Sequence, residues 1–307
     1  MKKKILYLML IVLLGEGQLV FADTNTGANF LKISVGARAV GMGSAYTAVA
    51  DDATAIYWNP AGLSRLFKRE LSLMHSEWLL GTKYDFMGYA HPVPWGTVGL
   101  GITRLSVGEL EGRSSDREAM GRFSAAGTAY IIGFSMPLSC QSGIGVNIKY
   151  LTSKLGSDSA STFSLDLGAI HKLKDKPISL GISLQNIGPG MKFLSQRDTL
   201  PLSLVVGGAY QISGAFGMVL DLKYEPYDRK VSVGIGTEYT ALSILSLRAG
   251  YASYVAQSVG EQRIGSSSLS GLGGGFGLKM GNYTADYVFM PFSDLGNVQN
   301  ISLGARF

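Results

Sequence analysis

The sequence predicts an all-β protein: a transmembrane, up-and-down antiparallel β-barrel of about fourteen strands with a small N-terminal helical segment in its lumen. Three observations predict this fold. Apolar residues alternate with small or polar residues over most of the chain. Charged residues make up only 16% of it, against about 25% in ordinary soluble domains. The strand candidates are even in number, and their connections alternate in length.

The N-terminus is predicted to be an export signal. Residues 2–4 are lysines, residues 5–14 form an apolar core, and residues 20–22 resemble a cleavage site. The alternative is an uncleaved anchor, but ten apolar residues are too few to span a bilayer of about 30 Å. We therefore expect a signal peptide over residues 1–22, a luminal segment over 23–67 and a barrel over 68–307.

The predicted strands show the period of two that places successive side chains on opposite faces. Ile178, Leu180 and Ile182, for example, alternate with serine and glycine. An even number of strands is typical of bacterial single-chain barrels. In chain order the predicted strands are residues 69–78, 83–90, 97–105, 124–136, 144–152, 162–170, 178–186, 202–211, 216–224, 231–239, 245–254, 272–280, 283–289 and 300–307.

The connections between these strands support the same fold. Those after even-numbered strands are compact, and those after odd-numbered strands tend to be long and polar, with the short connection 79–82 as an exception. Outer-membrane barrels combine short periplasmic turns with longer external loops. Both chain ends are therefore expected on the periplasmic side. The long predicted loops are residues 106–123, 153–161, 187–201 and 255–271.

The distribution of charge indicates what covers the apolar face. Along residues 144–150, 163–169, 218–224 and 283–289, the apolar phase carries no acidic or basic side chain. An Arg or Lys facing lipid at the midplane costs about 2–4 kcal/mol, so outer-membrane lipid is the expected cover. The alternative, a periplasmic β-sandwich, explains the alternation but not fourteen strands in one unit. The opposite phase carries Lys149, Asp166, Asp221, Lys223, Glu238, Arg248, Asp286 and Arg306.

The last residue, Phe307, adds a signal for assembly in the outer membrane. An aromatic residue at the end of the final strand resembles the signal that the outer-membrane assembly machinery reads, so this machinery is an expected partner. Ala305 departs from that signal, because an aromatic residue is usual at its position.

The segment 23–67 breaks the strand pattern. Ala45, Ala48, Val49 and Ile56 follow helical spacing, and Asp51 and Asp52 precede residues 53–58 as capping residues would. The segment is rich in small residues, as are the inward phases of several strands. Because small faces allow close backbone contact, we expect this segment to plug the lumen. The alternative is a periplasmic tail.

Two stretches carry a resemblance to a known family. The run from Gly36-Ala37-Arg38-Ala39 to Trp58-Asn59-Pro60-Ala61-Gly62-Leu63 resembles the start of the PorV/PorQ family, which is related to FadL-type fatty-acid transporters. The stretch 186–193 resembles the family's mid-barrel hairpin. The resemblance implies a fourteen-stranded barrel whose N-terminal segment, hereafter the hatch, carries its motif at Asn59, Pro60 and Ala61.

The resemblance implies two alternative functions. A FadL-like barrel binds or passively transports hydrophobic compounds, whereas a PorV-like barrel receives secreted cargo proteins in type IX secretion. Apolar Met191, Phe193 and Leu194 in an otherwise polar loop predict a ligand entrance. Gly99 and Gly101 are candidates for a wall kink, because glycine inside a strand often marks a bend; the alternative is that they only pack against the hatch.

Other chemistry is not predicted. Two glycine-rich clusters lack the Gly-Lys-Ser/Thr continuation of a phosphate loop, and His75, His91 and His171 do not have metal-ligand spacing. The single Cys140 cannot form an internal disulfide. We therefore expect no catalytic site, metal or cofactor, and the mild net charge of +5 gives no reason to expect nucleic acid.

Overall fold

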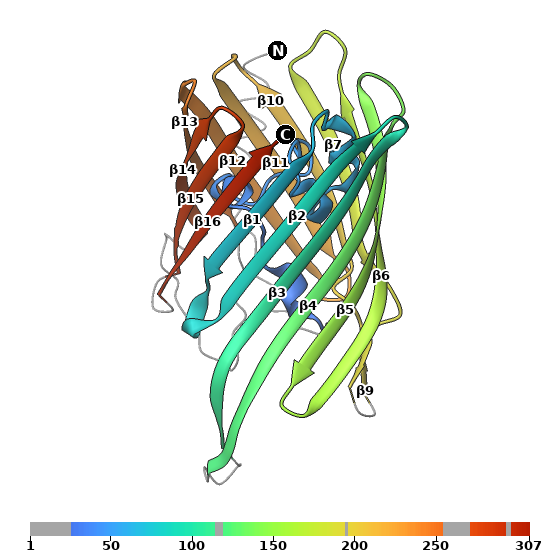
Figure 1. Ribbon diagram of the computed structural model, residues 1–307, viewed down its shortest axis with the longest axis vertical. Helices are drawn as coiled ribbons and strands as arrows, with labels where there is room; N and C mark the ends of the chain where they lie inside the picture. The colour runs from blue at the N-terminus through green and yellow to red at the C-terminus, as the bar shows by residue number, and fades with distance from the viewer. Residues whose placement is uncertain (1–25, 114–118, 194–195, 254–270, 293–295) are drawn as a thin grey trace.

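A computed structural model describes residues 26–113, 119–193, 196–253, 271–292 and 296–307. They form the predicted closed antiparallel barrel (Figure 1), in which neighbours in the chain are neighbours in the sheet and β1 pairs with β16. The fourteen barrel strands are β1 (Glu70–Glu77), β2 (Lys83–Val93), β3 (Gly96–Arg113), β4 (Ala119–Pro137), β5 (Ser142–Leu155), β6 (Asp158–Lys172), β7 (Ile178–Ile187), β10 (Ser203–Gln211), β11 (Phe216–Glu225), β12 (Lys230–Leu242), β13 (Leu245–Ala252), β14 (Leu272–Met280), β15 (Tyr283–Pro291) and β16 (Asn297–Arg306).

The two ends of the barrel differ. At the C-terminal end, uppermost in Figure 1, the described strands are joined by short turns. At the opposite end the β3–β4 hairpin projects beyond its neighbours (Figure 1). Between β7 and β10 the chain forms a separate two-stranded sheet of β8 (Met191–Phe193) and β9 (Gln196–Asp198). A short 3-10 helix, η3 (Leu79–Gly81), joins β1 to β2.

The prediction of loops is wrong for two segments, because strands occupy most of each segment. Over residues 106–123 the ladder of β3 and β4 continues, with register shifts between Val107 and Leu110 and between Glu111 and Arg113. Over residues 153–161 β5 and β6 continue to a tight turn at Gly156, whose φ is 59°. Backbone pairing does not require one apolar face, so strands that extend beyond the lipid lose the alternation that predicts them.

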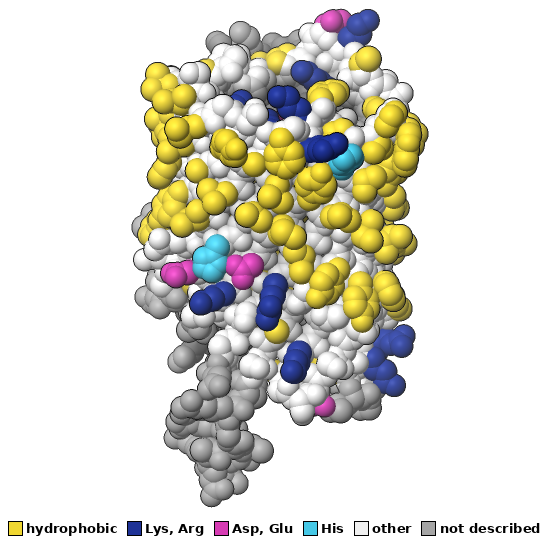
Figure 2. All heavy atoms as spheres, in the orientation of Figure 1, with side chains coloured by type: hydrophobic (Ala, Val, Ile, Leu, Met, Phe, Trp, Pro, Cys, Tyr) yellow, Lys and Arg dark blue, Asp and Glu magenta, His cyan; other side chains and the backbone are white. Residues whose placement is uncertain are grey.

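The outer surface of the barrel is apolar, as predicted. Ile132, Ile148 and Phe163 are 63%, 55% and 62% exposed, and Phe307 is 59% exposed. Figure 2 shows apolar side chains over much of the visible face, with charged side chains and a histidine both in its upper part and below the apolar side chains. Lys149, Asp166 and Asp221 on the opposite phase are buried. Apolar side chains therefore face out of the barrel and Lys149, Asp166 and Asp221 face in, the arrangement required of a barrel surrounded by lipid. His75 and Asp85 are exceptions, because their side chains are 51% and 49% exposed.

The described part of the hatch lies inside the barrel (Figure 1). It contains η1 (Asn29–Lys32), α2 (Ala37–Gly41), α3 (Ala55–Trp58) and η2 (Pro60–Arg65). Its Val35, Ala45, Tyr46, Ala50 and Leu63 are completely buried. The signal peptide expected over residues 1–22 lies outside the described residues.

The helices of the hatch are shorter than the sequence pattern suggests. The helix expected over residues 53–58 is limited to α3, and only residues 47–49 of the stretch 45–50 form a turn. Within the described ranges, no helix is long and apolar enough to span a membrane.

Candidate functional site

The predicted hatch motif ties η2 to the hatch and to the barrel wall. Asn59 Oδ1 accepts a hydrogen bond from the Ala61 N–H at 3.1 Å and so caps η2. Its Nδ2 donates to the carbonyl oxygens of Thr47 at 2.9 Å and Ala169 in β6 at 3.1 Å. Pro60 occupies the first helical position, where its missing N–H costs no hydrogen bond. The fully buried Asn59 therefore satisfies backbone groups of three segments.

Inward-facing glycines let the wall approach the hatch. A Cβ atom added at Gly168 would overlap Asn59 Oδ1, and one at Gly145 would overlap the backbone of Pro60. On other strands, a Cβ atom at Gly236 would overlap the backbone of Met42. We call these glycines the glycine belt; its members are Gly88, Gly99, Gly101, Gly127, Gly133, Gly143, Gly145, Gly168, Gly181, Gly207, Gly234, Gly236, Gly250 and Gly273. The glycines thus let the hatch pack closely against many strands of the wall.

Gly99 and Gly101, predicted as a wall kink, belong to this belt. A Cβ at Gly99 would lie 2.8 Å from Leu63 Cδ1, and one at Gly101 would lie 3.2 Å from Ile56 Cγ2. Pairing of β3 with β2 and β4 is continuous through both glycines. These contacts agree with the alternative interpretation, in which the two glycines pack against the hatch. A lateral opening of the wall at these residues stays a prediction.

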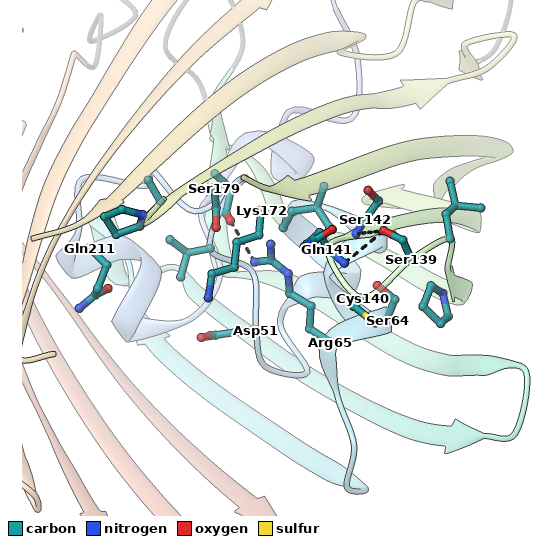
Figure 3. A pocket seen from close by; sticks show the side chains of 18 of the residues that line it. Asp51, Ser64, Arg65, Ser139, Cys140, Gln141, Ser142, Lys172, Ser179 and Gln211 are labelled. Carbon is teal, nitrogen blue, oxygen red and sulfur yellow. Dashed lines mark hydrogen bonds between the residues drawn. The ribbon is translucent and has the colours of Figure 1, made fainter. Parts of the chain in front are cut away.

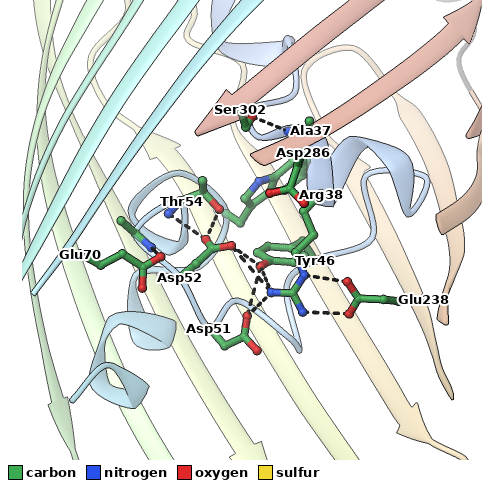
Figure 4. Close-up of polar contacts among 12 residues, drawn as sticks. Ala37, Arg38, Tyr46, Asp51, Asp52, Thr54, Glu70, Glu238, Asp286 and Ser302 are labelled. Carbon is green, nitrogen blue, oxygen red and sulfur yellow. Dashed lines mark hydrogen bonds and ion pairs between the residues drawn. The ribbon is translucent and has the colours of Figure 1, made fainter. Parts of the chain in front are cut away.

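The side of the hatch that carries α2, away from Asn59 and η2, has a network of charged side chains (Figure 4). Arg38 of α2 donates through Nε and Nη2 to the two carboxylate oxygens of Glu238, both at 3.0 Å, and its Nη1 lies 2.5 Å from Asp51 Oδ1. Arg248 then joins Glu238 at 2.8 Å to Asp286 at 2.6 Å. These ion pairs connect the hatch to β12, β13 and β15. A cavity of about 330 Å³ lies beside them.

Tyr46 and Asp52 extend this network within the hatch. The Tyr46 hydroxyl donates to Asp52 Oδ2 at 2.6 Å, and the Thr54 N–H donates to Asp52 Oδ1 at 2.9 Å. Burial raises the pKa of Tyr46; Arg38 opposes that change, and Asp52 and Asp51 add to it. Tyr46 is therefore a neutral donor. Asp52 contacts the first turn of α3 as expected, but Asp51 pairs with Arg38 and does not cap the helix.

A cavity of about 500 Å³, lined by apolar side chains together with Lys154, Asp158 and Asp198, lies toward the end opposite to the C-terminus. Phe193 of β8 lines it together with Phe30 of η1 and Leu105 of β3. Met191, also predicted for the ligand entrance, is 1% exposed. It belongs to the cluster of buried apolar residues that also contains Phe30. Leu194 lies outside the described residues. Phe30 was not predicted; the only signal for it is an aromatic residue within a segment of small residues.

The chain that follows β9, whose Asp198 lines this cavity, is joined to the start of the described hatch. The Gly27 N–H donates to the Thr199 carbonyl oxygen at 2.9 Å. Lys32 forms an ion pair with Asp228, in the β11–β12 turn, at 2.7 Å. The hatch therefore reaches from the C-terminal end of the barrel to its opposite end. Across the described ranges, no group of three His, Cys, Asp or Glu side chains could hold a metal ion.

Comparison with solved structures identifies the architecture. The toluene transporter TodX of Pseudomonas putida aligns with 89% of this chain and 96% of its own, with a TM-score of 0.64 and 14% identity. The toluene transporter TbuX of Ralstonia pickettii gives a TM-score of 0.65 at 13% identity, over 89% of this chain and 98% of its own. A Pseudomonas aeruginosa FadL homologue gives 0.62 at 11% identity, over 90% and 98%. The fold is that of a FadL-like barrel.

The sequence comparisons add less. Residues 20–152 of this FadL-like barrel match the model of a family described as "Uncharacterised protein family (UPF0164)". No curated protein matches the chain. The predicted relation to FadL-type proteins is thus confirmed for the fold, and the PorV/PorQ assignment stays a prediction.

Proposed function

We propose that this barrel binds hydrophobic small molecules and lets them pass across the outer membrane, around the hatch. The observation that carries the proposal is the cavity at the end opposite to the C-terminus, where Phe30, Leu105 and Phe193 supply apolar surface. Its volume of about 500 Å³ lies within the range of about 300–1,000 Å³ that is usual for small-ligand sites. With both chain ends in the periplasm, this cavity would open toward the outside of the cell.

The ligand class has further support. TodX and TbuX, which share this fold, are toluene transporters. The packing of the hatch against the glycine belt argues against a wide diffusion pore, because close contacts on many strands narrow the space between hatch and wall. A hydrophobic compound needs only a transient gap between hatch and wall, together with apolar surface on which to leave water.

Substitution of Phe193 tests the proposal. Phe193→Asp replaces an aromatic side chain of the cavity by a carboxylate, in addition to Asp158 and Asp198 of its lining, so we expect binding of radiolabelled palmitate and of radiolabelled toluene to weaken about tenfold or more. Gln196→Asp is the matched control, because Gln196 pairs with Phe193 in the same hairpin but is exposed. Equal binding by the wild type and Phe193→Asp, measured at equilibrium in neutral-lipid nanodiscs, would contradict the proposal.

A second candidate is the PorV-like role of receiving secreted cargo proteins. The projecting β3–β4 hairpin (Figure 1) favours it, since strands that extend beyond the lipid present backbone and side chains to a protein partner. This role requires co-purification with proteins that carry a shared C-terminal secretion domain. A genome without the type IX machinery would rule it out.

A further inference from the structure

The outer face of β1, β2 and β3 carries ionisable side chains within the band that is apolar on the other strands. We call this set the outer charged cluster; its members, all on the outward phase, are His75 and Glu77 of β1, Lys83 and Asp85 of β2, and Arg104 of β3. Figure 2 shows a histidine with acidic side chains beside it and basic side chains below it. Lys154, near the β5–β6 turn, is the one other Lys, Arg, Asp or Glu among the outward side chains that the structure describes on the barrel strands.

The register of the sheet places this cluster at a depth where its neighbours face lipid. His75 pairs with Ile301 of β16, and two strands further along the same row lies Phe276; these two side chains are 52% and 42% exposed. On β2, the outward His91 follows the outward Asp85 by six positions. On a strand tilted by about 45°, that distance covers about 14 Å of the membrane normal, against about 25 Å for the apolar band of a barrel. Charges at this depth need a polar cover, because facing lipid is costly for them.

The charges of the cluster alternate in sign from strand to strand. Glu77 pairs with Lys83 in the register of the sheet, and His75 pairs with Asp85, whose Oδ1 lies 2.6 Å from His75 Nδ1. Asp85 pairs in turn with Arg104. The cluster is therefore acidic on its β1 flank, at Glu77, and basic on its β3 flank, at Arg104. Because its acidic and basic side chains balance, it suits a partner that presents both signs rather than an anionic headgroup.

A second copy of this chain presents both signs in the matching order. Two copies in one membrane point the same way, so an isologous pair has its two-fold axis along the membrane normal. This axis exchanges the β1 flank of one copy with the β3 flank of the other, and so brings Glu77 toward Arg104 of the second copy. Glu77 lies two residues beyond His75 on β1, whereas Arg104 lies two strands across from it.

Glu77 and Arg104 also match in depth. The front strands lean from upper right to lower left (Figure 1), so both a step along β1 and a step from β1 toward β3 lead away from the C-terminal end. At the usual tilt of about 35–45°, each of the two residues lies about 5–7 Å below His75 along the membrane normal. The two-fold axis therefore joins an acidic and a basic side chain at the same level of the membrane.

We propose that this face of the barrel is an interface between two copies of the chain, in which Glu77 of each copy pairs with Arg104 of the other. The same axis places Met87 of β2 opposite Ile301 of β16, and these side chains are 48% and 52% exposed, so apolar contacts flank the ion pairs. Each charge at the flanks then faces an opposite charge instead of acyl chains. The interface is independent of the ligand proposed above.

Energy transfer between labelled copies measures this association. Cys140, the single cysteine, is exposed in the β4–β5 turn at the C-terminal end (Figure 3), so a dye on its thiol leaves the cluster free. We expect donor- and acceptor-labelled full-length protein to show energy transfer in phosphatidylcholine vesicles, and an excess of unlabelled protein to abolish it. Energy transfer no greater than that of randomly distributed copies would overturn the proposal.

Two charge reversals test the ion pair. Either Glu77→Arg or Arg104→Glu sets like charges against each other twice in a pair of identical copies, so we expect the apparent dissociation constant in lipid to rise about tenfold or more. Lys154→Glu is the matched control, because Lys154 is an outward cation outside the cluster, and it should change the constant less than about twofold. Association of Arg104→Glu at the wild-type level would overturn the proposal.

A mixture of the two reversed variants tests the two-fold axis itself. A pair of one Glu77→Arg copy and one Arg104→Glu copy contains one native and one reversed ion pair. Donor-labelled copies of the first should therefore associate with acceptor-labelled copies of the second to within about threefold of the wild type, which also shows that both are folded. If both variants give the circular dichroism of a folded barrel and the mixture does not associate, the proposal is overturned, and another protein or a lipid headgroup covers the cluster. Where a reversed variant does not fold, Arg104→Gln decides: we expect an approximately fivefold weaker association, and an unchanged one overturns the proposal.

Discussion

The hatch meets the barrel wall in two different ways. Toward β3–β7, η2 and Asn59 lie against inward glycines so closely that main chain meets main chain. Toward β12–β16, the backbone of Met42 and Gly43 lies equally close to glycines of β12 and β13, and beside this contact Arg38 supplies ion pairs at a cavity of about 330 Å³. Backbone contacts of this kind have one geometry, whereas paired side chains can separate and regain water. The η2 side is thus a fixed anchor, and on the α2 side the ion-paired part around Arg38 is where the hatch can move.

The largest expected effect breaks the anchor. Gly168→Val adds a side chain where even a Cβ atom overlaps Asn59 Oδ1, so we expect the free energy of unfolding to fall by about 3 kcal/mol or more. The hatch should also leave its place, which raises ion conductance across planar bilayers. Gly208→Val in β10 is the control, because a Cβ at Gly208 has no atom within 4 Å. Equal losses in the two variants, measured by denaturant unfolding in detergent, would mean that the glycine contacts do not hold the hatch.

A smaller effect is expected on the α2 side. Arg38→Gln removes the ion pairs to Glu238 and Asp51, but Glu238 keeps Arg248. Because these side chains are partly exposed, we expect unfolding free energy to fall by only about 1–2 kcal/mol. Conductance should nevertheless rise, because the loosened side faces the charged cavity. Arg197→Gln, on the exposed part of β9, is the control. A stability loss as large as that of Gly168→Val without a rise in conductance would remove the distinction between the two sides.

The sequence predicts the wall of the barrel better than its ends. Within the lipid, a residue such as Ile148 must face outward and Lys149 inward, so each strand carries a period of two. Beyond the lipid that constraint ends. The extensions of β3 and β4, and the hairpin of β8 and β9, therefore lie in segments whose sequence predicts loops.

The residues of the candidate sites also differ in how well the sequence predicts them. Asn59 is predictable, because its motif is local in the sequence. The partner of Arg38, Glu238, lies 200 positions away, and only strand register and barrel closure bring the two together. Phe30 escapes prediction for the same reason: a single aromatic residue in the hatch becomes informative only when the wall opposite is known.

The central claim is that the hatch closes the barrel and that passage requires its movement. The ion conductance of the full-length wild-type protein in planar bilayers tests this claim most directly. The close contacts between hatch and wall predict a closed baseline with at most brief, small openings. A steady conductance typical of an open, water-filled barrel would contradict it.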